Sequence, residues 1–408
     1  MSQSIDSLQQ NLSDQSLRVD SSKQFTHEAL PDASHDEFSR QEFVKSLKLH
    51  IATQIAPRNR DVYERKVKPN FVNEEGRDPR SRHEVRPKMA EESYYQFWSG
   101  LLRTSQEMMW ESVASSVERQ LPELVGAARE SSRGAGGSLR LDEDLAVPKY
   151  HTAVDIHCQP GGYHTELTSD DVAAGAIYDR AVYLYAMGRM GPFNDDIGAS
   201  LAAHIKKDWP ELSPRRILDL GCSVGHSTIP YKDLFPEAEV FGVDVAAPML
   251  RHAHFRAESL GRPIHFSQQN AEDLDFEDET FDLIVSHILL HETSTKAIRN
   301  IVNECRRLLA PGGIMLHGEV PQYAGMDPYD AFILDWDTYN NNEPFWGTVH
   351  DMDLKALAIG AGFDEENLIE TFAPSSFAEA EARRTHQFQG GDFGGGGQWF
   401  AFGALKGS

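Results

Sequence analysis

The sequence predicts an α/β fold with a mostly parallel sheet that is covered by helices on both faces. Three observations predict it. Short apolar runs bounded by turn residues begin beyond about residue 150, helical patterns lie between these runs, and a glycine turn follows the run ILDL at residues 217–220. This alternation is typical of parallel sheets, because parallel neighbours need a crossover connection between them.

Charge and composition limit the possible partners. The 408 residues carry 39 basic and 63 acidic side chains, a formal net charge of −24. Such a surface repels phosphate backbones and anionic lipids, so we expect no nucleic-acid partner and no membrane partner. Three scattered cysteines are too few for a disulfide framework, and the first residues lack the apolar core of a signal peptide. These features favour a cytoplasmic protein.

The N-terminal third is predicted to be mainly helical. Residues 1–38 are rich in Ser, Gln and Asp, and we expect a mobile polar arm there. Residues 39–150 hold two amphipathic stretches around a polar segment, residues 57–87, that we expect to be irregular. Glycines and serines at residues 131–138 predict a break. Residues 39–150 are therefore a candidate cap or dimerisation region, and we expect a homodimer.

Residues 151–408 are predicted to form the main domain. Its apolar runs predict strands at 217–220, 239–244, 264–269, 281–286, 313–319 and 398–405. Helical patterns between them predict helices at 227–235, 248–260, 295–309 and 353–361. An aromatic helix at about 176–187 precedes the first of these strands.

The glycine turn and a later aspartate predict a nucleotide-like ligand. Gly221 and Gly225 let backbone N–H groups approach a ligand closely. Asp244 ends the next strand, 19 residues after Gly225, where a carboxylate can accept hydrogen bonds from ribose hydroxyls. A dinucleotide site would have GxGxxG, but Ser223 replaces the middle glycine. Asp219 would repel a pyrophosphate and suits a ligand with a cationic amine, which indicates S-adenosylmethionine (SAM).

At these motifs the chain resembles the class I SAM-dependent methyltransferases, over residues 215 to about 320. The resemblance rests on DLGCSVG (219–225), Asp244, QNAE (269–272), FDLIVSH (281–287) and LLAPGG (308–313), in that order. It implies a Rossmann-like sheet of seven strands, with SAM as cofactor and S-adenosylhomocysteine as product. The cofactor-binding residues that it implies are Tyr178, Asp219, Gly221, Ser223, Gly225, Asp244, Val245, Asn270, Ala271, Glu272, Ser286 and His287.

Histidines near the expected acceptor site are candidate bases. Ligands of this fold bind beyond the carboxyl ends of the strands, where His287 and His291 follow the fourth main strand. We expect His287 to line the cofactor pocket or act as a base, and His291 to pack structurally or contact substrate. The order HxxxHE differs from the zinc-protease order HExxH, so a metal here is disfavoured.

A second histidine cluster, HCQPGGYH at residues 157–164, precedes the main strands. We interpret it as a loop that closes over the cofactor or the acceptor, with His164 as a candidate base and Tyr163 as a substrate contact. A metal held by His157, Cys158 and His164 stays open but is disfavoured, since zinc would need four ligands with recognisable pairing.

A long aromatic segment follows the fifth main strand, at about residues 321–352. Long loops in compact domains are often lids, so we expect a substrate loop here. Its candidate substrate contacts are Trp336, Tyr339, Phe345 and Trp346, and His350 is a third candidate base. The alternative is a hydrophobic dimer surface.

Together these features predict an enzyme that moves the methyl group of SAM to an O, N or S atom of a small-molecule acceptor by in-line displacement. One alternative is a SAM-binding regulatory or scaffold protein without turnover. Another is an NAD-dependent oxidoreductase, which Ser223 and Asp219 disfavour.

Overall fold

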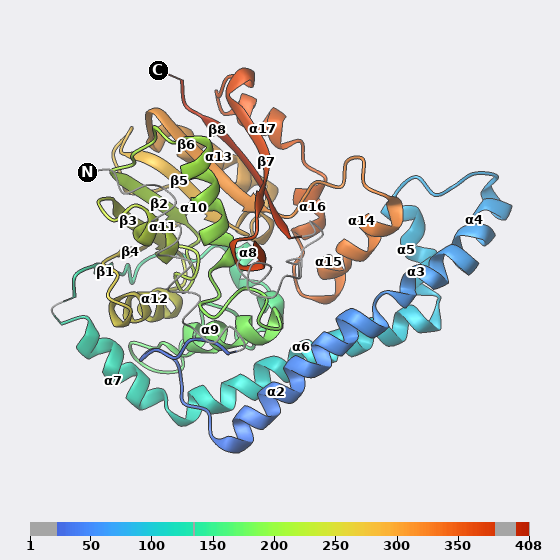
Figure 1. Ribbon diagram of the computed structural model, residues 1–408, viewed down its shortest axis with the longest axis horizontal. Helices are drawn as coiled ribbons and strands as arrows, with labels where there is room; N and C mark the ends of the chain where they lie inside the picture. The colour runs from blue at the N-terminus through green and yellow to red at the C-terminus, as the bar shows by residue number, and fades with distance from the viewer. Residues whose placement is uncertain (1–22, 134, 380–396, 408) are drawn as a thin grey trace.

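An eight-stranded sheet forms the middle of the protein (Figure 1). The computed structural model describes residues 23–133, 135–379 and 397–407. The strand order is β1-β4-β3-β2-β5-β6-β8-β7. The strands are β1 (Ser138–Arg140), β2 (Arg216–Leu220), β3 (Glu239–Asp244), β4 (His265–Gln268), β5 (Phe281–His287), β6 (Leu309–Glu319), β7 (Leu368–Pro374) and β8 (Gln398–Leu405).

The predicted α/β class is confirmed. Strands β1 to β6 pair in parallel, and β8 joins β6 and β7 in antiparallel ladders. The carboxyl ends of β2, β3, β4 and β5 therefore meet at one edge of the sheet. Leu220 pairs with Val243 on one side and Ser286 on the other, so the turns that follow these strands lie next to one another.

The sheet has one strand more than the seven predicted. Strand β1 follows the glycine-rich break and pairs with β4, with Ser138 opposite His265 and Arg140 opposite Ser267. Three residues, of which only Leu139 is apolar, carry too little pattern to mark a strand. The predicted boundary at residue 150 thus lies after a segment that already belongs to the sheet.

Two apolar layers hold helices on the two faces of the sheet. On β2, Ile217 packs with α10 (Asp196–Asp208), α11 (Ile229–Leu234) and α12 (Ala247–Ser259). Its neighbour Leu218 packs with α13 (Thr295–Leu308) and α17 (Leu354–Gly360). Successive strand residues point to opposite faces, so both are fully buried.

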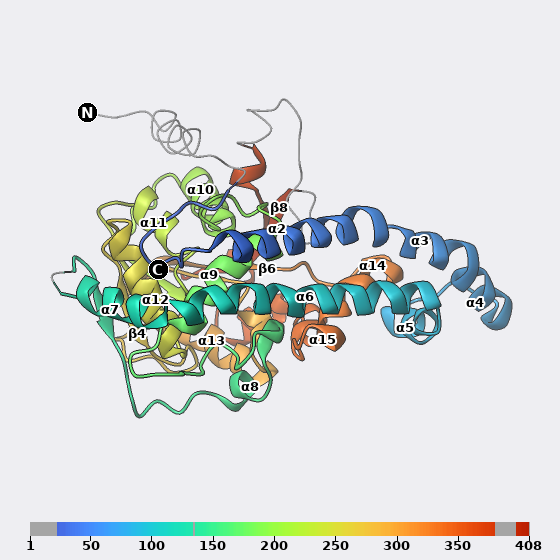
Figure 2. The same cartoon turned by 90° about the horizontal axis from the view of Figure 1, so that it is seen from below.

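Among the N-terminal helices, α2 and α6 lie side by side and pack on α9 (Ala173–Tyr185), α7 packs against α12, and α3, α4 and α5 project beyond the opposite end of the molecule (Figure 2). They are α2 (His35–His50), η1 (Ile51–Ile55), α3 (Arg58–Val62), η2 (Tyr63–Val67), α4 (Lys68–Glu75), α5 (Arg82–Ala90), α6 (Ser93–Arg119) and α7 (Leu121–Ser131). The prediction of an irregular segment at residues 57–87 is wrong, because most of these residues are helical. Its proline Pro69 stands in the first turn of α4, where a missing N–H leaves no bond unmade.

The described part of the predicted mobile arm, residues 23–38, is ordered. Residues before α2 pack against the rest of the protein, and α2 itself begins at His35. Residues 1–22 lie outside the described part of the chain. Gln24 donates to the buried Asp179 carboxylate at 3.0 Å, and Ala29 is fully buried. Helix α2 begins at His35, after Ser34, whose side chain caps it reciprocally with Glu37.

Shorter helices connect these parts. They are α8 (Lys149–Thr152), η3 (Ile156–Cys158), α9 (Ala173–Tyr185), η4 (Leu290–Glu292), α14 (Pro328–Leu334), α15 (Trp336–Asn340), α16 (Trp346–His350) and η5 (Glu365–Asn367). The segment predicted as a substrate loop is thus three helices, α14 to α16, and α14 packs against α5. No helix of the described residues is both long enough and apolar enough to cross a membrane.

Candidate functional site

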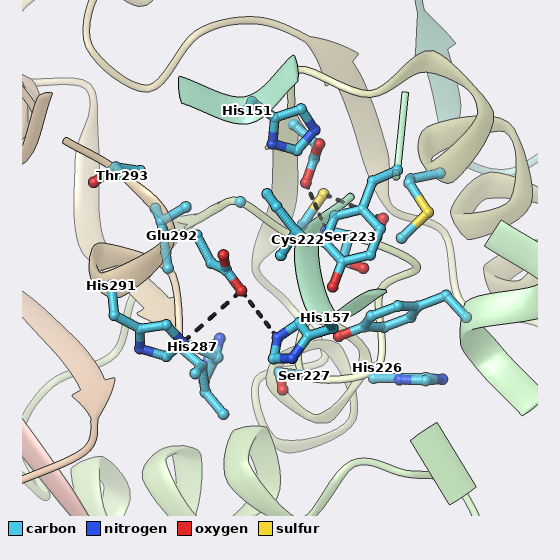
Figure 3. Close-up of a pocket in the computed structure, with 18 of the residues that line it drawn as sticks. His151, His157, Cys222, Ser223, His226, Ser227, His287, His291, Glu292 and Thr293 are labelled. Carbon is cyan, nitrogen blue, oxygen red and sulfur yellow. Dashed lines mark hydrogen bonds and ion pairs between the residues drawn. The ribbon is translucent and has the colours of Figure 1, made fainter. Parts of the chain in front are cut away.

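A cavity of about 220 Å³ lies at the carboxyl edge of the parallel strands. Residues that follow β2, β3, β4 and β5 form one part of its wall, and side chains from α6, α9 and residues 150–163 form the rest (Figure 3). The sequence predicted many of its lining residues: Tyr163, Tyr178, Asp219, Gly221, Ser223, Asp244, Val245, Asn270, Ala271, His287, His291 and Trp346.

The glycine turn after β2 forms the floor of the cavity. Gly221 has a φ of +64°, which favours glycine, and an added Cβ would lie 2.5 Å from Leu289. Ser223 adopts a φ of +51° at the position where the family commonly has glycine. Its backbone N–H donates to Asp244 at 3.0 Å, so the turn and the end of β3 are tied together.

Asp244 is a half-buried carboxylate on the cavity wall. One oxygen accepts from Ser223 and the other from the Ala246 N–H at 2.9 Å. Burial raises the pKa of Asp244, and the neighbouring His151 opposes this rise. A carboxylate oxygen has more than one lone pair, so each can still accept from a ligand hydroxyl.

Asp219 and His287 form the next stretch of wall. His287 Nδ1 lies 3.1 Å from Asp219, and its Nε2 lies 3.0 Å from the Tyr231 hydroxyl. Both ring nitrogens of His287 therefore have partners within the protein. This arrangement makes His287 an orienting residue and leaves it no free nitrogen for the predicted role of base.

The wall chemistry fits the expected cofactor. Asp219 and Asp244 place two carboxylates on the cofactor side of the cavity, and most of the other lining residues are apolar or aromatic. Ribose hydroxyls, an ammonium and a sulfonium are the groups that such a wall would hold. Asn270 and Ala271 line the side beyond β4, where the adenine was expected.

His291 has a different environment from His287. Its Nδ1 lies 2.7 Å from a Glu319 oxygen on β6, while its Nε2 has no hydrogen-bond partner among the described residues. Burial lowers the pKa of His291, but the Glu319 carboxylate outweighs it and raises that pKa to about 9. A carboxylate that orients one nitrogen and leaves the other open is the usual arrangement around a general base.

Beside His291 lie His157, Glu292 and Glu343. Figure 3 shows the Glu292 carboxylate between the rings of His157 and His291. His157 Nε2 lies 3.0 Å from Glu292, and its Nδ1 lies 3.0 Å from Glu343. Burial lowers the pKa of His157, but the two carboxylates outweigh it and hold the pKa well above its usual value.

Helix α6 fixes the backbone at His157. The Trp110 indole and the Gln106 amide donate to the His157 carbonyl at 2.7 and 3.1 Å. His157 has a φ of +52°, a conformation uncommon for residues other than glycine. The N-terminal helices thus take part in building the cavity.

A buried network behind Tyr178 joins the cavity to the N-terminal segment. Asp179 accepts from Gln24 and lies 2.8 Å from His226 Nε2 and 3.0 Å from His252 Nε2. Burial raises the pKa of Asp179, but His226 and His27 outweigh it and hold that pKa well below its usual value. Tyr178 stacks on His226, with 6.0 Å between ring centroids.

Several predicted site residues do not line this cavity. Gly225 lies deeper in the turn, Glu272 accepts from Tyr150 at 2.9 Å, and Ser286 contacts His317 in the core at 2.7 Å. His164 and Phe345 also stand outside the lining residues, so their predicted roles gain no support from the geometry.

Three residues of the predicted substrate loop point elsewhere. Trp336 packs among the N-terminal helices and donates to Ser99 at 2.8 Å, and Tyr339 is exposed. His350 is buried off the cavity, and burial with the charge of His291 lowers its pKa to about 3. The predicted roles of Trp336, Tyr339 and His350 therefore stay predictions without a contact to the cavity.

The sequence did not predict the three glutamates that pair with the histidines of the site. Glu319 and Glu343 had no motif around them, and Glu292 drew attention only as part of HxxxHE. Their positions follow from strand pairing and from packing of the segment after β6. Only a carboxylate at the end of a strand, as in Glu319, offered a signal.

Comparisons with known proteins agree with the glycine turn and the strands around it. Residues 217–313 match a family described as a methyltransferase domain. A demethylmenaquinone methyltransferase of Thermus thermophilus is 35% identical over 129 residues, 32% of this chain and 56% of that protein. A tRNA N(3)-methylcytidine methyltransferase of Drosophila melanogaster is 26% identical over 188 residues, 41% of this chain and 54% of that protein.

A solved structure of Haemonchus contortus phosphoethanolamine N-methyltransferase 2 aligns with 57% of this chain and 58% of its own, at 18% identity and a TM-score of 0.40. The chain spans about half the length of the curated relatives reported above, at 56% and 54%. The names of the two curated relatives cover unlike acceptors, so these comparisons leave the acceptor of this chain open.

Proposed function

The chain carries a methyltransferase domain of the class I SAM-dependent family, and from that premise we propose that it is an enzyme that methylates a hydroxyl oxygen of a small molecule. The observation that carries this proposal is the His291–Glu319 pair on the cavity wall, with His291 Nε2 unpartnered among the described residues. A hydroxyl acceptor must lose a proton, whereas a thioether acceptor needs no base.

The cofactor side of the cavity would hold SAM through Asp244, Asn270 and the backbone of the glycine turn, with Asp219 opposite its cationic groups. SAM supplies a methyl group that is already activated by a sulfonium. The chain then has to align the acceptor, exclude water and remove one proton.

His291 in its neutral form takes the proton of the acceptor hydroxyl, and Glu319 stabilises the imidazolium that results. Because the pKa of His291 is raised to about 9, the rate should increase as the pH rises from 7 towards 9. His287 keeps the Asp219 carboxylate in place through its Nδ1 contact. Trp346 packs on the His291 ring, 4.7 Å between centroids, and keeps water from its face. The acceptor is proposed to be a small molecule because α6 and the segment after β6 line the cavity and narrow its acceptor side, and because the net charge of −24 disfavours nucleic acid.

Labelled SAM tests the proposal. The purified chain is incubated with methyl-labelled SAM and a small-molecule extract of its host, and products are identified by mass spectrometry. We expect a labelled methyl ether. The variant His291→Gln should lose about 100-fold or more in kcat and keep its affinity for S-adenosylhomocysteine. The exposed His83 on α5 gives the matched control His83→Gln, which should match the wild type.

A labelled amine or thioether as the sole product would contradict the hydroxyl assignment. Tight S-adenosylhomocysteine binding without any labelled product would favour the alternative of a SAM-binding protein without turnover. The homodimer and the cytoplasmic location remain predictions, which light scattering and localisation of the tagged chain would check.

A further inference from the structure

Three side chains that the proposed proton transfer does not use meet at the acceptor end of the cavity. They are His157, Glu292 and Glu343, and one nitrogen or oxygen of each lies within 4.8 Å of the other two. His157 comes from the connection before α9, Glu292 follows β5, and Glu343 lies between α15 and α16. Folding thus brings together three segments that are far apart in the sequence.

The contacts leave one carboxylate oxygen open. His157 Nδ1 and the Asn341 amide lie 3.0 and 2.7 Å from Glu343 Oε1. Glu343 Oε2 has no hydrogen-bond partner among the described residues, although the Glu343 side chain is fully buried. A buried charged oxygen without a partner is costly, which indicates that a bound group belongs beside it.

The open oxygen faces a second open atom. His291 Nε2 lies 3.8 Å from Glu343 Oε2 and 3.9 Å from Glu292 Oε1, too far for a hydrogen bond, and it too is unpartnered in the described ranges. Atoms that bind one metal ion at about 2.1 Å lie roughly 3 to 4 Å apart. The two carboxylates therefore border a space of the size of an ion site, with His157 at 3.0 Å from each carboxylate and His291 Nε2 at the edge of that space.

The net charge of the cluster also favours a bound cation. Within residues 23–133, 135–379 and 397–407, the ion pairs of Glu292 and Glu343 are with histidines alone, His157 and His291. Glu319 adds a third carboxylate, which is paired with His291. Even two protonated histidines would leave one negative charge uncompensated in this buried cluster.

We propose that His157, Glu292 and Glu343 bind one divalent transition-metal ion, such as zinc, at the acceptor end of the cavity. One imidazole and two carboxylates form a mixed nitrogen and oxygen set that suits such ions, and two carboxylates neutralise a dication. Three protein ligands leave a position open, as in catalytic zinc sites.

The role of the ion rests on the proposed function, although its binding does not. An ion in this place would bind the acceptor oxygen in its open position and lower the pKa of that hydroxyl. His291 is adjacent and would receive the proton. The substrate class that follows is a hydroxyl compound able to coordinate a metal, such as a phenol or a hydroxy acid.

The test measures metal binding without cofactor or acceptor. The full chain is treated with EDTA and desalted, and is then titrated with Zn²⁺ by calorimetry and with Co²⁺ by visible absorption. We expect one equivalent of either ion and a visible band from coordinated Co²⁺. The variant Glu343→Gln should weaken both ions at least 10-fold, and the exposed Glu366 gives the control Glu366→Gln, which should bind as the wild type.

The metal stoichiometry of the wild type is sufficient to overturn the inference. If it takes up less than half an equivalent of Zn²⁺ and Co²⁺ at micromolar concentration, the cluster is held by a protonated His157 and no ion. Equal metal affinity of the wild type and Glu343→Gln would also overturn it. If Glu343→Gln does not fold, Glu292→Gln takes its place in the same titration. Titration of the same samples with S-adenosylhomocysteine tests the cofactor site separately, so failure of one proposal is distinguishable from failure of the other.

Discussion

His287 and His291 lie four residues apart, and their neighbours give them different roles. Strand β5 ends at His287, so its ring contacts Asp219 on the adjacent β2. The chain then turns through η4, which brings the ring of His291 to Glu319 on β6. The His287–Asp219 pair lies on the cofactor side of the cavity, and the His291–Glu319 pair lies on the acceptor side. The sequence shows two similar histidines, and the partner carboxylates tell them apart.

The Asp244 carboxylate carries the first residue-scale prediction. Asp244→Ala should weaken S-adenosylhomocysteine binding by at least 10-fold, because hydrogen bonds to a charged group are worth about 1.5 to 3 kcal/mol. The same change removes the acceptors of the Ser223 and Ala246 N–H groups, which loosens the glycine turn. Calorimetry measures the affinity.

Glu277 provides the control for that variant, since it is an exposed acid in the loop between β4 and β5. Glu277→Gln should leave the affinity unchanged. An Asp244→Ala protein that binds as tightly as the wild type would mean that Asp244 supports the turn and does not contact the cofactor.

At the scale of elements, the segment after β6 is held to the N-terminal helices by a buried carboxylate. Asp335, between α14 and α15, is 1% exposed and lies 2.9 Å from Arg82 Nε on α5. Arg86 of α5 also contacts Asp335, and Arg82 contacts Asp351 beyond α16. The guanidinium groups thus fix the segment that carries Glu343 and Trp346 beside the N-terminal helices.

Asp335→Asn should lower the free energy of unfolding by about 3 kcal/mol, because removing one partner of a buried ion pair leaves charges uncompensated. Urea unfolding followed by circular dichroism measures it. Asp330→Asn is the matched control, since Asp330 is about half exposed in its pair with Arg60, and it should cost less than about 1 kcal/mol. Equal losses in the two variants would contradict the distinction between buried and exposed pairs.

At the scale of the whole molecule, buried histidines couple stability to pH. Burial lowers the pKa of several histidines below the ordinary value near 6.5, that of His317 to about 4 and that of His350 to about 3. Between these values the unfolded chain binds protons that the folded chain does not. The free energy of unfolding therefore falls as the pH drops from about 6.5 towards 4, by up to about 3 kcal/mol for each histidine.

His317→Gln should reduce that pH dependence, since the variant removes one of these groups. Urea unfolding at pH 7.5 and at pH 5 gives the difference in stability for each protein. We expect the wild type to lose more stability than the variant between these two pH values. The same loss in both proteins would show that His317 is not held neutral by the fold.

Much of the fold could be predicted because its signals are local. The apolar runs at 217–220 and 239–244 and the glycines around Ser223 marked strands and a turn without reference to any partner. Strand β1 and the helices in residues 57–87 could not be predicted, since one depends on pairing with β4 and the others on burial against α6 and α14. Their own sequences carry a weak pattern.

The sequence by itself determined the α/β class, the cofactor turn and Asp244, because spacing along one strand and its turn fixes where those groups lie. Only the tertiary structure decided that His291 pairs with Glu319 and that His157, Glu292 and Glu343 meet at the acceptor end. Those contacts join residues more than 25 positions apart on separate elements. Their distances depend on how the sheet, the N-terminal helices and the segment after β6 pack together, and no short-range pattern encodes that.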